Sequence, residues 1–263
     1  MKRLFFLLLI VVGSAFAAGQ ESWGGPIVIE LDGKGFDSAF TDVQHGVTFD
    51  FFHFGEPVEM AWTEPGRNIG FLVLNRHGNE ALKTDEHENA LLFFKIRDGW
   101  KQRAASGGTP DADPAIFHVA SSREMFGLLT NQPLSREEAA VEMAKSPPEP
   151  YYSNGFHALS VFDRKEMGGN GDGLIDANDL VFSHLRVWVD TAHNGRSEDG
   201  KMYTLPELGI KYISLDHTTT NQIDGHGNHI RHVGKIGMVD NTRSPLAIYD
   251  VNFCMIRNHS GSQ

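Results

Sequence analysis

Residues 168–179 constrain the fold and function of this chain more than any other segment. They follow the spacing of an EF-hand calcium loop, which has oxygen ligands at alternate positions, a glycine at the sixth and an acidic residue at the twelfth. Gly173 stands at the sixth position, and Ile175 at the eighth is the usual apolar plug. The predicted oxygen ligands are Asn170, Asp172, Leu174 through its carbonyl, Asp176 and Asp179.

Two positions depart from this pattern. Gly168 occupies the first position, where an acidic ligand is expected, and Asp179 replaces the usual glutamate at the twelfth. Aspartate is one methylene shorter, so it reaches a cation less easily with both oxygens. We therefore expect one calcium site of reduced affinity, at which magnesium competes better.

The first residues predict export. A basic start at Lys2 and Arg3 precedes an apolar run from Leu4 to Val12 and the small residues Ala15 and Ala17, as in a secretory signal peptide spanning residues 1–17. The run is too short to span about 30 Å of hydrocarbon, and no later segment is apolar enough. We expect a secreted or periplasmic protein without a transmembrane segment after signal cleavage.

The charge balance bears on the choice of partner. The chain has 23 basic and 34 acidic residues and a formal charge of −11. No long basic run exists, which argues against nucleic acid, whereas an excess of carboxylates suits divalent cations. Cys254 is the only cysteine, so no internal disulfide can form, and bound metal is one remaining source of stability.

Short apolar segments predict strands, and helical spacing is confined to the neighbourhood of the calcium loop. Phe156, Leu159 and Phe162 recur at helical spacing before the loop, and Leu180 and Leu185 follow it. We expect an α+β fold, a β-rich single domain with short helices flanking EF-hand-like calcium loops. The predicted strands include residues 27–31, 71–74, 185–189, 212–215 and 230–239.

A second, weaker echo of the loop begins at Asp190. Gly195 takes the sixth position, but Lys201 takes the twelfth, where its ammonium group repels a cation. Two further echoes, at residues 75–79 and 50–55, have lost acidic ligands, and the phenyl rings of the latter exclude metal. The weaker second metal site would use Asp190, Asn194, Arg196 and Glu198.

A longer pattern of spacing extends through the chain, in residues 25–36, 46–50, 71–76, 124–127, 154–179 and 205–209. In these segments the chain resembles exported bacterial EF-hand-like calcium-binding proteins, related to the calcium-binding segments of hemolysin-type and adhesin proteins. The resemblance covers roughly residues 25–252 and implies one calcium-binding domain there.

The resemblance carries two further implications. Asn79 and Glu124 are close together in that family, so residues 80–120 are expected to be an insertion that splits one loop. In the family an acid that closes the preceding helix, here Asp163, stands in as first ligand across a short insertion. It would replace Gly168, and Glu166 is a second candidate for the same position.

The main hypothesis is a secreted, non-enzymatic calcium-binding protein, in which calcium stabilises the fold or a contact with a cell-envelope or extracellular protein. One alternative is a dockerin-like or adhesin-type interaction module. A second is a secreted hydrolase with its site around the insertion, although the spacing of its candidates supports no mechanism. Those candidates are Asp111, Asp113, His118 and Glu138.

The 13 histidines raise the question of transition metals. His226, His229 and His232 form the densest group, but on a strand His229 and His232 point to opposite faces and form no chelating pair. His53 and His77 lie in degraded loops, where imidazole suits zinc or copper better than calcium. Solvated surface histidines are the ordinary interpretation.

Overall fold

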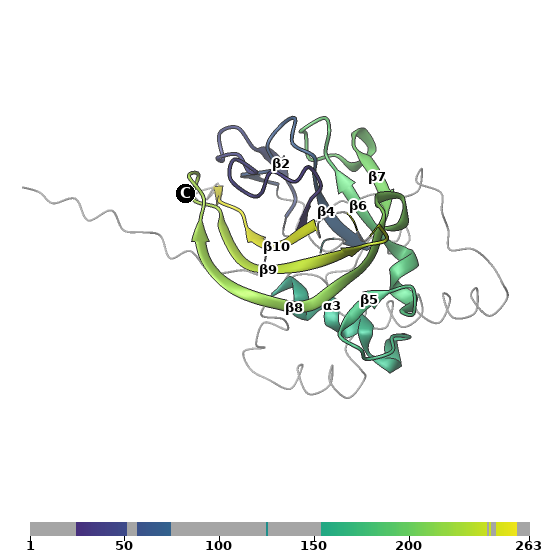
Figure 1. The fold of residues 1–263 in the computed structure, drawn as a ribbon. Helices are drawn as coiled ribbons and strands as arrows, with labels where there is room; N and C mark the ends of the chain where they lie inside the picture. The colour runs from purple at the N-terminus through teal and green to yellow at the C-terminus, as the bar shows by residue number, and fades with distance from the viewer. Residues whose placement is uncertain are drawn as a thin grey trace, which may run out of the picture.

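A curled antiparallel sheet of eight strands dominates the molecule. The computed structural model describes residues 25–51, 57–74, 125, 154–240, 242 and 246–256. The sheet has the strand order β5-β8-β9-β10-β1-β4-β6-β7, and its long strands bend like half of a barrel in Figure 1. Its strands are β1 (Ile27–Glu30), β4 (Ile69–Leu74), β5 (Leu174–Asp176), β6 (Leu185–Val189), β7 (Lys201–Thr204), β8 (Ile210–Ile223), β9 (His229–Met238) and β10 (Leu246–Asn252).

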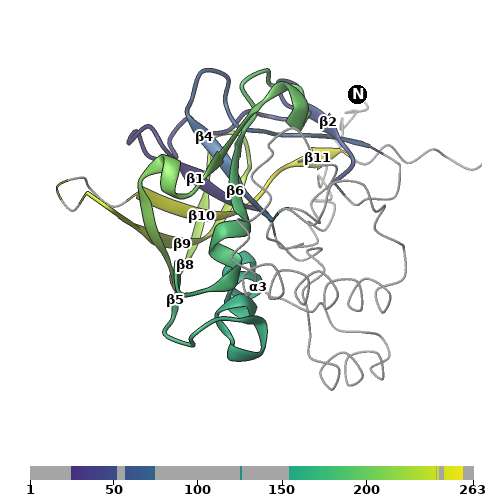
Figure 2. The ribbon, with the colours of Figure 1, turned by 90° about the vertical axis from the view of Figure 1, so that its right-hand side faces the viewer.

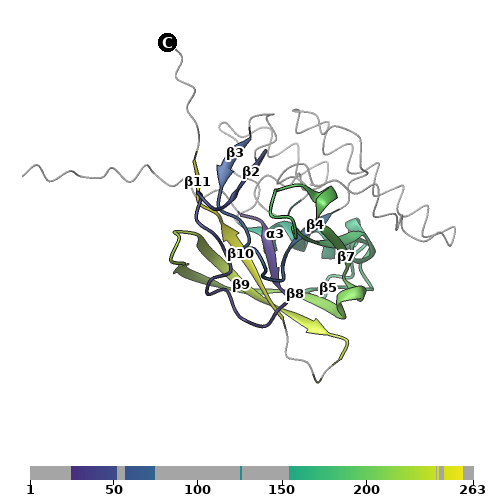
Figure 3. The same cartoon turned by 90° about the horizontal axis from the view of Figure 1, so that it is seen from above.

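A smaller sheet of three strands has the order β11-β3-β2. Figure 3 shows these strands side by side. Figure 2 shows α3 below and the smaller sheet above, with strands of the large sheet between them. The small sheet consists of β2 (Val47–Phe49), β3 (Val58–Met60) and β11 (Met255–Ile256).

Both faces of the large sheet are buried at its central strands β1, β4 and β6. Successive residues of a strand point to opposite faces, and in β1 Ile27 and Ile29 join one apolar cluster while Val28 joins another. Burial on both faces explains why β4 is apolar throughout, with every residue of Ile69–Leu74 buried. The first cluster, here the helix-side core, includes Phe156, Leu159, Phe162, Ile175 and Leu185.

The second cluster, here the aromatic core, lies under the small sheet. Trp62 is fully buried, and its ring centroid is 4.6 Å from that of Phe71 and 5.8 Å from that of Trp188. Phe49 of β2 also packs on Trp62, at 5.2 Å. Such aromatic pairs add to the stability gained from apolar burial, so this cluster joins the two sheets.

The expected α+β class, with helices flanking the loop, is wrong. Among the described residues only α3 (Gly155–Ser160) is an α-helix, and it has six residues. The second predicted helix is a 3₁₀ turn that ends where β6 begins at Leu185, and the chain is mostly β. The 3₁₀ turns are η2 (Val161–Asp163), η3 (Lys165–Met167), η4 (Leu180–His184), η5 (Ser197–Asp199) and η6 (Pro206–Leu208).

The reason lies in the spacing of the apolar residues. Phe156, Leu159 and Phe162 recur every third residue, which suits a 3₁₀ turn as well as an α-helix, and α3 passes directly into η2. Arg164 then adopts an extended conformation that ends the segment. The helical spacing marks segments that do turn, but they form one short α-helix and 3₁₀ turns where regular helices were expected.

The predicted strands are confirmed. The segments expected at residues 27–31, 71–74 and 185–189 are β1, β4 and β6, and those around the Asp224 turn are β8 and β9. Residues 1–17 and the expected insertion at 80–120 lie outside the described residues, as does the echo at 75–79. No helix in the described part of the chain is both long and apolar enough to cross a membrane.

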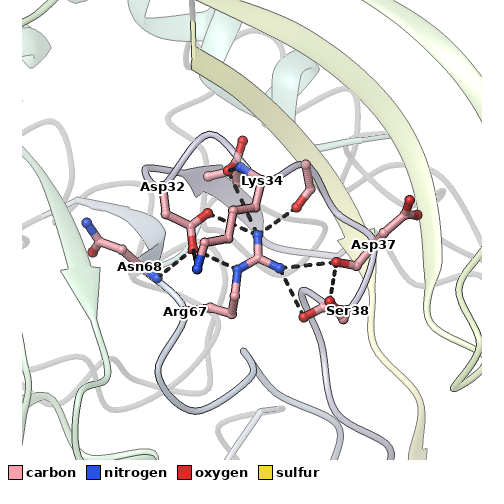
Figure 4. A network of polar contacts seen from close by, with 8 residues as sticks. Asp32, Lys34, Asp37, Ser38, Arg67 and Asn68 are labelled. Atoms are coloured by element: carbon pink, nitrogen blue, oxygen red, sulfur yellow. Dashed lines mark hydrogen bonds and ion pairs between the residues drawn. The ribbon is translucent and has the colours of Figure 1, made fainter.

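Arg67 closes the turn that follows β1 (Figure 4). Its Nε and Nη2 donate to the two oxygens of Asp32 at 2.7 and 3.0 Å, and its remaining N–H groups donate to backbone carbonyls of Gly35, Asp37 and Ser38. All five guanidinium donors are therefore satisfied. The hydrogen bonds from Arg67 hold the pKa of the Asp32 carboxyl far below its usual range.

Candidate metal centre

Asp163 folds back onto the predicted calcium loop. Its carboxylate accepts backbone N–H groups from Gly171 at 2.8 Å, Asp172 at 3.2 Å and Gly173 at 2.9 Å. The side chain is buried, with an exposed fraction of 7%. Glu166, the other predicted substitute for the first ligand, lies exposed on η3 and receives none of these three amides. We name residues 163–179 the first loop.

The oxygens at the third and fifth positions of the first loop also receive local amides. The Asn170 side-chain oxygen accepts the N–H of Asp172 at 3.0 Å, and Asp172 accepts the N–H of Leu174 at 2.9 Å. Asp176 accepts the N–H of Asn178 at 2.8 Å. These hydrogen bonds shape the turn and use part of each oxygen's capacity, because a carboxylate oxygen has more than one lone pair.

Asp179 closes the first loop from inside the protein. It is 3% exposed and accepts the N–H groups of Asn170 at 3.2 Å and Asp176 at 2.8 Å. Burial raises the pKa of Asp179, and the negative charges of Asp163 and Asp176 act in the same direction, against the lowering by its hydrogen bonds. The ionised carboxylates of the loop therefore repel one another.

The first loop is fixed to the edge of the large sheet. Ile175 is fully buried in the helix-side core, as its position predicts, and β5 pairs with Tyr212–Ser214 of β8. Gly169 permits the return of the chain past Asp163, because a Cβ at this position would lie 2.2 Å from the Asp163 backbone. The sheet and this close approach together hold the turn in place.

The donor chemistry of the first loop suits calcium. The predicted ligands are all oxygen atoms, which hard cations prefer. No group of three or more His, Cys, Asp or Glu side chains converges on a common point among the described residues. Calcium binding therefore requires the carboxylates to turn toward a shared centre from the positions they hold here.

The second loop, residues 190–201, holds its acid differently. Asp190 is 7% exposed and accepts N–H groups from Asn194 at 3.0 Å and Gly195 at 2.8 Å. It also accepts the indole N–H of Trp62 at 2.9 Å, from the aromatic core. Asp190 is thus bonded to the interior of the protein as well as to its own turn.

The Asn194 side chain bonds within its own turn, although its backbone N–H donates to Asp190. The Asn194 oxygen accepts the N–H of Arg196 at 2.9 Å, and its amide nitrogen donates to Asp199 at 2.8 Å. Lys201 is exposed on β7. The side chain of Glu198 lies outside the described part, and its role as a ligand stays a prediction.

Comparison with known proteins shows the family of this chain. The sequence model of the SPM domain matches residues 120–254, just over half of the chain. The chain belongs to the SPM domain family. Both loops and the strands β5 to β10 fall inside the matched span.

The SPM domain shares its sheet with residues that precede it. The strands β1 and β4 lie outside the matched span, yet they occupy the centre of the large sheet, between β10 and β6. Val28 of β1 pairs with Tyr249 of β10, and Phe71 of β4 pairs with Trp188 of β6, so two strand pairs connect the two segments. The matched span and residues 25–74 therefore form one folded unit.

One relative of this chain is the iron-regulated protein FrpA of Neisseria meningitidis serogroup C. It is 33% identical over 96 residues, which is 36% of this chain. The match spans 8% of the length of FrpA, so it relates one segment of that protein to this chain.

Two polar arrangements in the SPM domain chain escaped the sequence analysis. The bond from Trp62 to Asp190 joins residues 128 positions apart. The other unites His217, His232 and Asp250 from three neighbouring strands. Spacing along the chain gives no signal for either, because the sheet order brings them together.

Proposed function

We propose that this SPM domain chain binds calcium through the first loop, and that the ion stabilises the fold or a surface contact. The observation that supports this is uncompensated charge. The four aspartates Asp163, Asp172, Asp176 and Asp179 make no ion pair with a basic side chain of the described residues, although Asp163 and Asp179 are buried. Backbone N–H groups satisfy these buried carboxylates in part, but their negative charge has no opposite charge beside it, and a divalent cation would offset that cost.

The proposed ligands are Asp163, Asn170, Asp172, the Leu174 carbonyl, Asp176 and Asp179. Asp163 occupies the role of a first-position acid, because it holds the amides of the turn that leads to Gly173. Bound calcium would supply positive charge between carboxylates that now repel one another. Extracellular calcium modules bind at about 10⁻⁴–10⁻³ M, and the short Asp179 is consistent with that range.

We further propose that the chain is exported and acts without catalysis, its calcium-filled loop contacting a cell-envelope or extracellular partner. Part of the first loop is on the surface: Asn170, Gly171, Asp172, Ala177 and Asn178 are exposed. An ion bound at this position would therefore stiffen an accessible segment next to the edge of the sheet.

Calorimetric titration of the full chain with calcium tests the proposal. We expect heat of binding and a rise in melting temperature, both lost in Asp172→Ala. At calcium tenfold above the dissociation constant, the native state should gain about 1.4 kcal/mol. Asp216→Ala is the matched control, because Asp216 is an exposed aspartate on β8 outside the loop. Absence of both heat and stabilisation, or equal binding by Asp172→Ala, would overturn the proposal.

A further inference from the structure

A row of polar residues crosses three strands beside α3. His232 of β9 pairs with Asp250 of β10, and its Nδ1 lies 3.0 Å from the Asp250 carboxylate. His217 of β8 pairs with Gly234, two residues along β9 from His232, and its ring centroid is 5.1 Å from that of His232 with the planes at 84°. His232 and Asp250 are buried, whereas His217 is exposed, so the row opens to solvent at one end.

The hydrogen bonds fix which nitrogen of each ring carries the proton. The Nδ1 of His217 lies 2.9 Å from the Leu215 carbonyl, which can only accept, so Nδ1–H donates. Asn154 uses its side-chain oxygen to cap α3, accepting from His157, so it presents its NH₂ group to Nε2 of His217 at 3.4 Å. Nε2 of His217 is therefore the acceptor, and its contact with Asn154 is longer than the range of about 2.7–3.2 Å that is usual for an N–H hydrogen bond.

The same reasoning applies to His232. Asp250 accepts the N–H of Gly155 at 3.2 Å with the same oxygen that faces Nδ1 of His232. A carboxylate in this role accepts, so Nδ1–H of His232 donates and its Nε2 has the lone pair in the neutral ring. Both histidines thus direct Nδ1 to an oxygen of the protein and have Nε2 as their acceptor atom, and a metal ion would displace the long contact that Asn154 makes with Nε2 of His217.

This is the arrangement in which proteins hold metal-binding histidines, with the second ring nitrogen donating to a carboxylate or a backbone carbonyl. The ring separation also fits. Two imidazoles on one tetrahedral ion, with metal–nitrogen bonds of about 2.0–2.1 Å, have centroids about 5 Å apart. We propose that His217 and His232 bind a borderline divalent transition metal ion, such as Zn²⁺, through their Nε2 atoms, with Asp250 orienting His232.

Two features of the surroundings support a built site. Phe156 stacks on His217 at 4.8 Å and 11°, and this ring sits over Gly234, where a Cβ would lie 2.6 Å from Phe156. Asp250 is 1% exposed, and its Oδ1 has no hydrogen-bond partner. A cation on His232 would offset the cost of burying the Asp250 carboxylate.

Imidazole ligands favour Zn²⁺, Cu²⁺ or Ni²⁺ over calcium, so this site differs from the first loop in the ions it takes. Two protein ligands leave coordination positions for water or an incoming ligand. Along the sequence His232 groups with His226 and His229, whereas the sheet places His217 beside it.

Zn²⁺ titration of the full chain, in saturating calcium and against a chromophoric chelator, tests the site. We expect stoichiometric binding that His217→Ala and His232→Ala each weaken at least about tenfold, and Asp250→Asn weakens about 10–100-fold, as loss of a supporting carboxylate does. His226→Ala is the matched control, because this exposed histidine in the turn before β9 should leave affinity unchanged. Asp172→Ala should lose calcium and keep Zn²⁺, which separates this proposal from the preceding one.

A second readout guards against misfolding of the buried variants. In nitrogen–proton correlation spectra of the histidine rings, Zn²⁺ should shift the Nε2 resonances of two histidines. His217→Gln, a change at an exposed side chain, should abolish both shifts without altering the rest of the spectrum. Zn²⁺ binding that survives in His217→Ala, or no binding by the wild-type chain, would overturn the proposal.

Discussion

The two acidic loops share one hydrogen-bond scheme. In the first loop Asp163 accepts the amides at the fifth and sixth positions, from Asp172 and Gly173. In the second loop Asp190 accepts those of Asn194 and Gly195. The fifth side chain then accepts the amide of the seventh residue in both loops. This match supports the assignment of Asp163 as a displaced first-position residue.

The loops differ in what surrounds their acids. In the first loop, burial and the negative charges of neighbouring aspartates raise the pKa of Asp179. In the second loop, Asp190 accepts a hydrogen bond from the Trp62 indole N–H. Local hydrogen bonds therefore form the turn in both cases, and they do not distinguish a metal site from a structural turn. The two loops differ instead in the negative charge of the aspartates in the first loop, which no basic side chain of the described residues offsets.

The largest expected difference between the loops is in calcium affinity. Asp163→Ala removes the first-position carboxylate of the first loop and should weaken calcium binding about 100-fold, or about 2.8 kcal/mol. Asp190→Ala removes the equivalent acid of the second loop and should leave the affinity within about threefold, since the first loop is unchanged. Calorimetry on both variants measures this.

Glu166→Ala resolves the remaining choice of first ligand, because Glu166 lies exposed near the same position. It should bind calcium as the wild-type chain does. A loss of binding in Glu166→Ala together with normal binding in Asp163→Ala would reverse the assignment, and a loss in Asp190→Ala would move the site to the second loop.

The second expected difference is in metal-free stability. Asp190→Ala leaves the buried indole N–H of Trp62 and two backbone amides without their acceptor. An unsatisfied buried donor costs about 1–3 kcal/mol, so we expect a loss of about 2–3 kcal/mol in urea denaturation with chelator present. Asp190→Asn keeps one acceptor oxygen and should lose less. A change below about 0.5 kcal/mol would show that Asp190 has no structural role.

The strands could be predicted from the sequence because each carries its own signal. The segment Ile69–Leu74 is a continuous apolar run, and Asp224 with Gly225 marks the turn between β8 and β9. The helices could not be predicted, because apolar residues at every third position do not separate an α-helix from a 3₁₀ turn. The pairing order of the sheet, with β1 and β4 between later strands, also has no local signal.

The same limit applies to the sites. The proposed ligand spacing from Asn170 to Asp179 is local, so it can be predicted from the sequence alone. Asp163 lies outside that spacing, and only the family resemblance predicts it as a ligand. The bond between Trp62 and Asp190 and the pairing of His217 with His232 depend on which strands are neighbours. Sites formed across a sheet become visible only when the strand order is known.

The smallest expected effect is a calcium-dependent change in pH sensitivity. Burial, with the charges of Asp163 and Asp176, raises the pKa of Asp179 in the folded chain. The resulting stabilisation is complete below the ordinary aspartate pKa of about 4 and is lost as the pH rises through the folded-state pKa. With chelator, the wild-type chain should therefore lose unfolding free energy relative to Asp179→Asn as the pH rises above about 4. Saturating calcium should reverse this trend, because the ion binds the ionised carboxylate.

Asp190→Asn, the matched variant in the second loop, should keep the difference between calcium and chelator, which urea denaturation across the pH range would measure. If wild-type curves with calcium and with chelator are parallel, Asp179 is not a calcium ligand, and the closing position of the first loop, like Lys201 in the second, supplies no ligand.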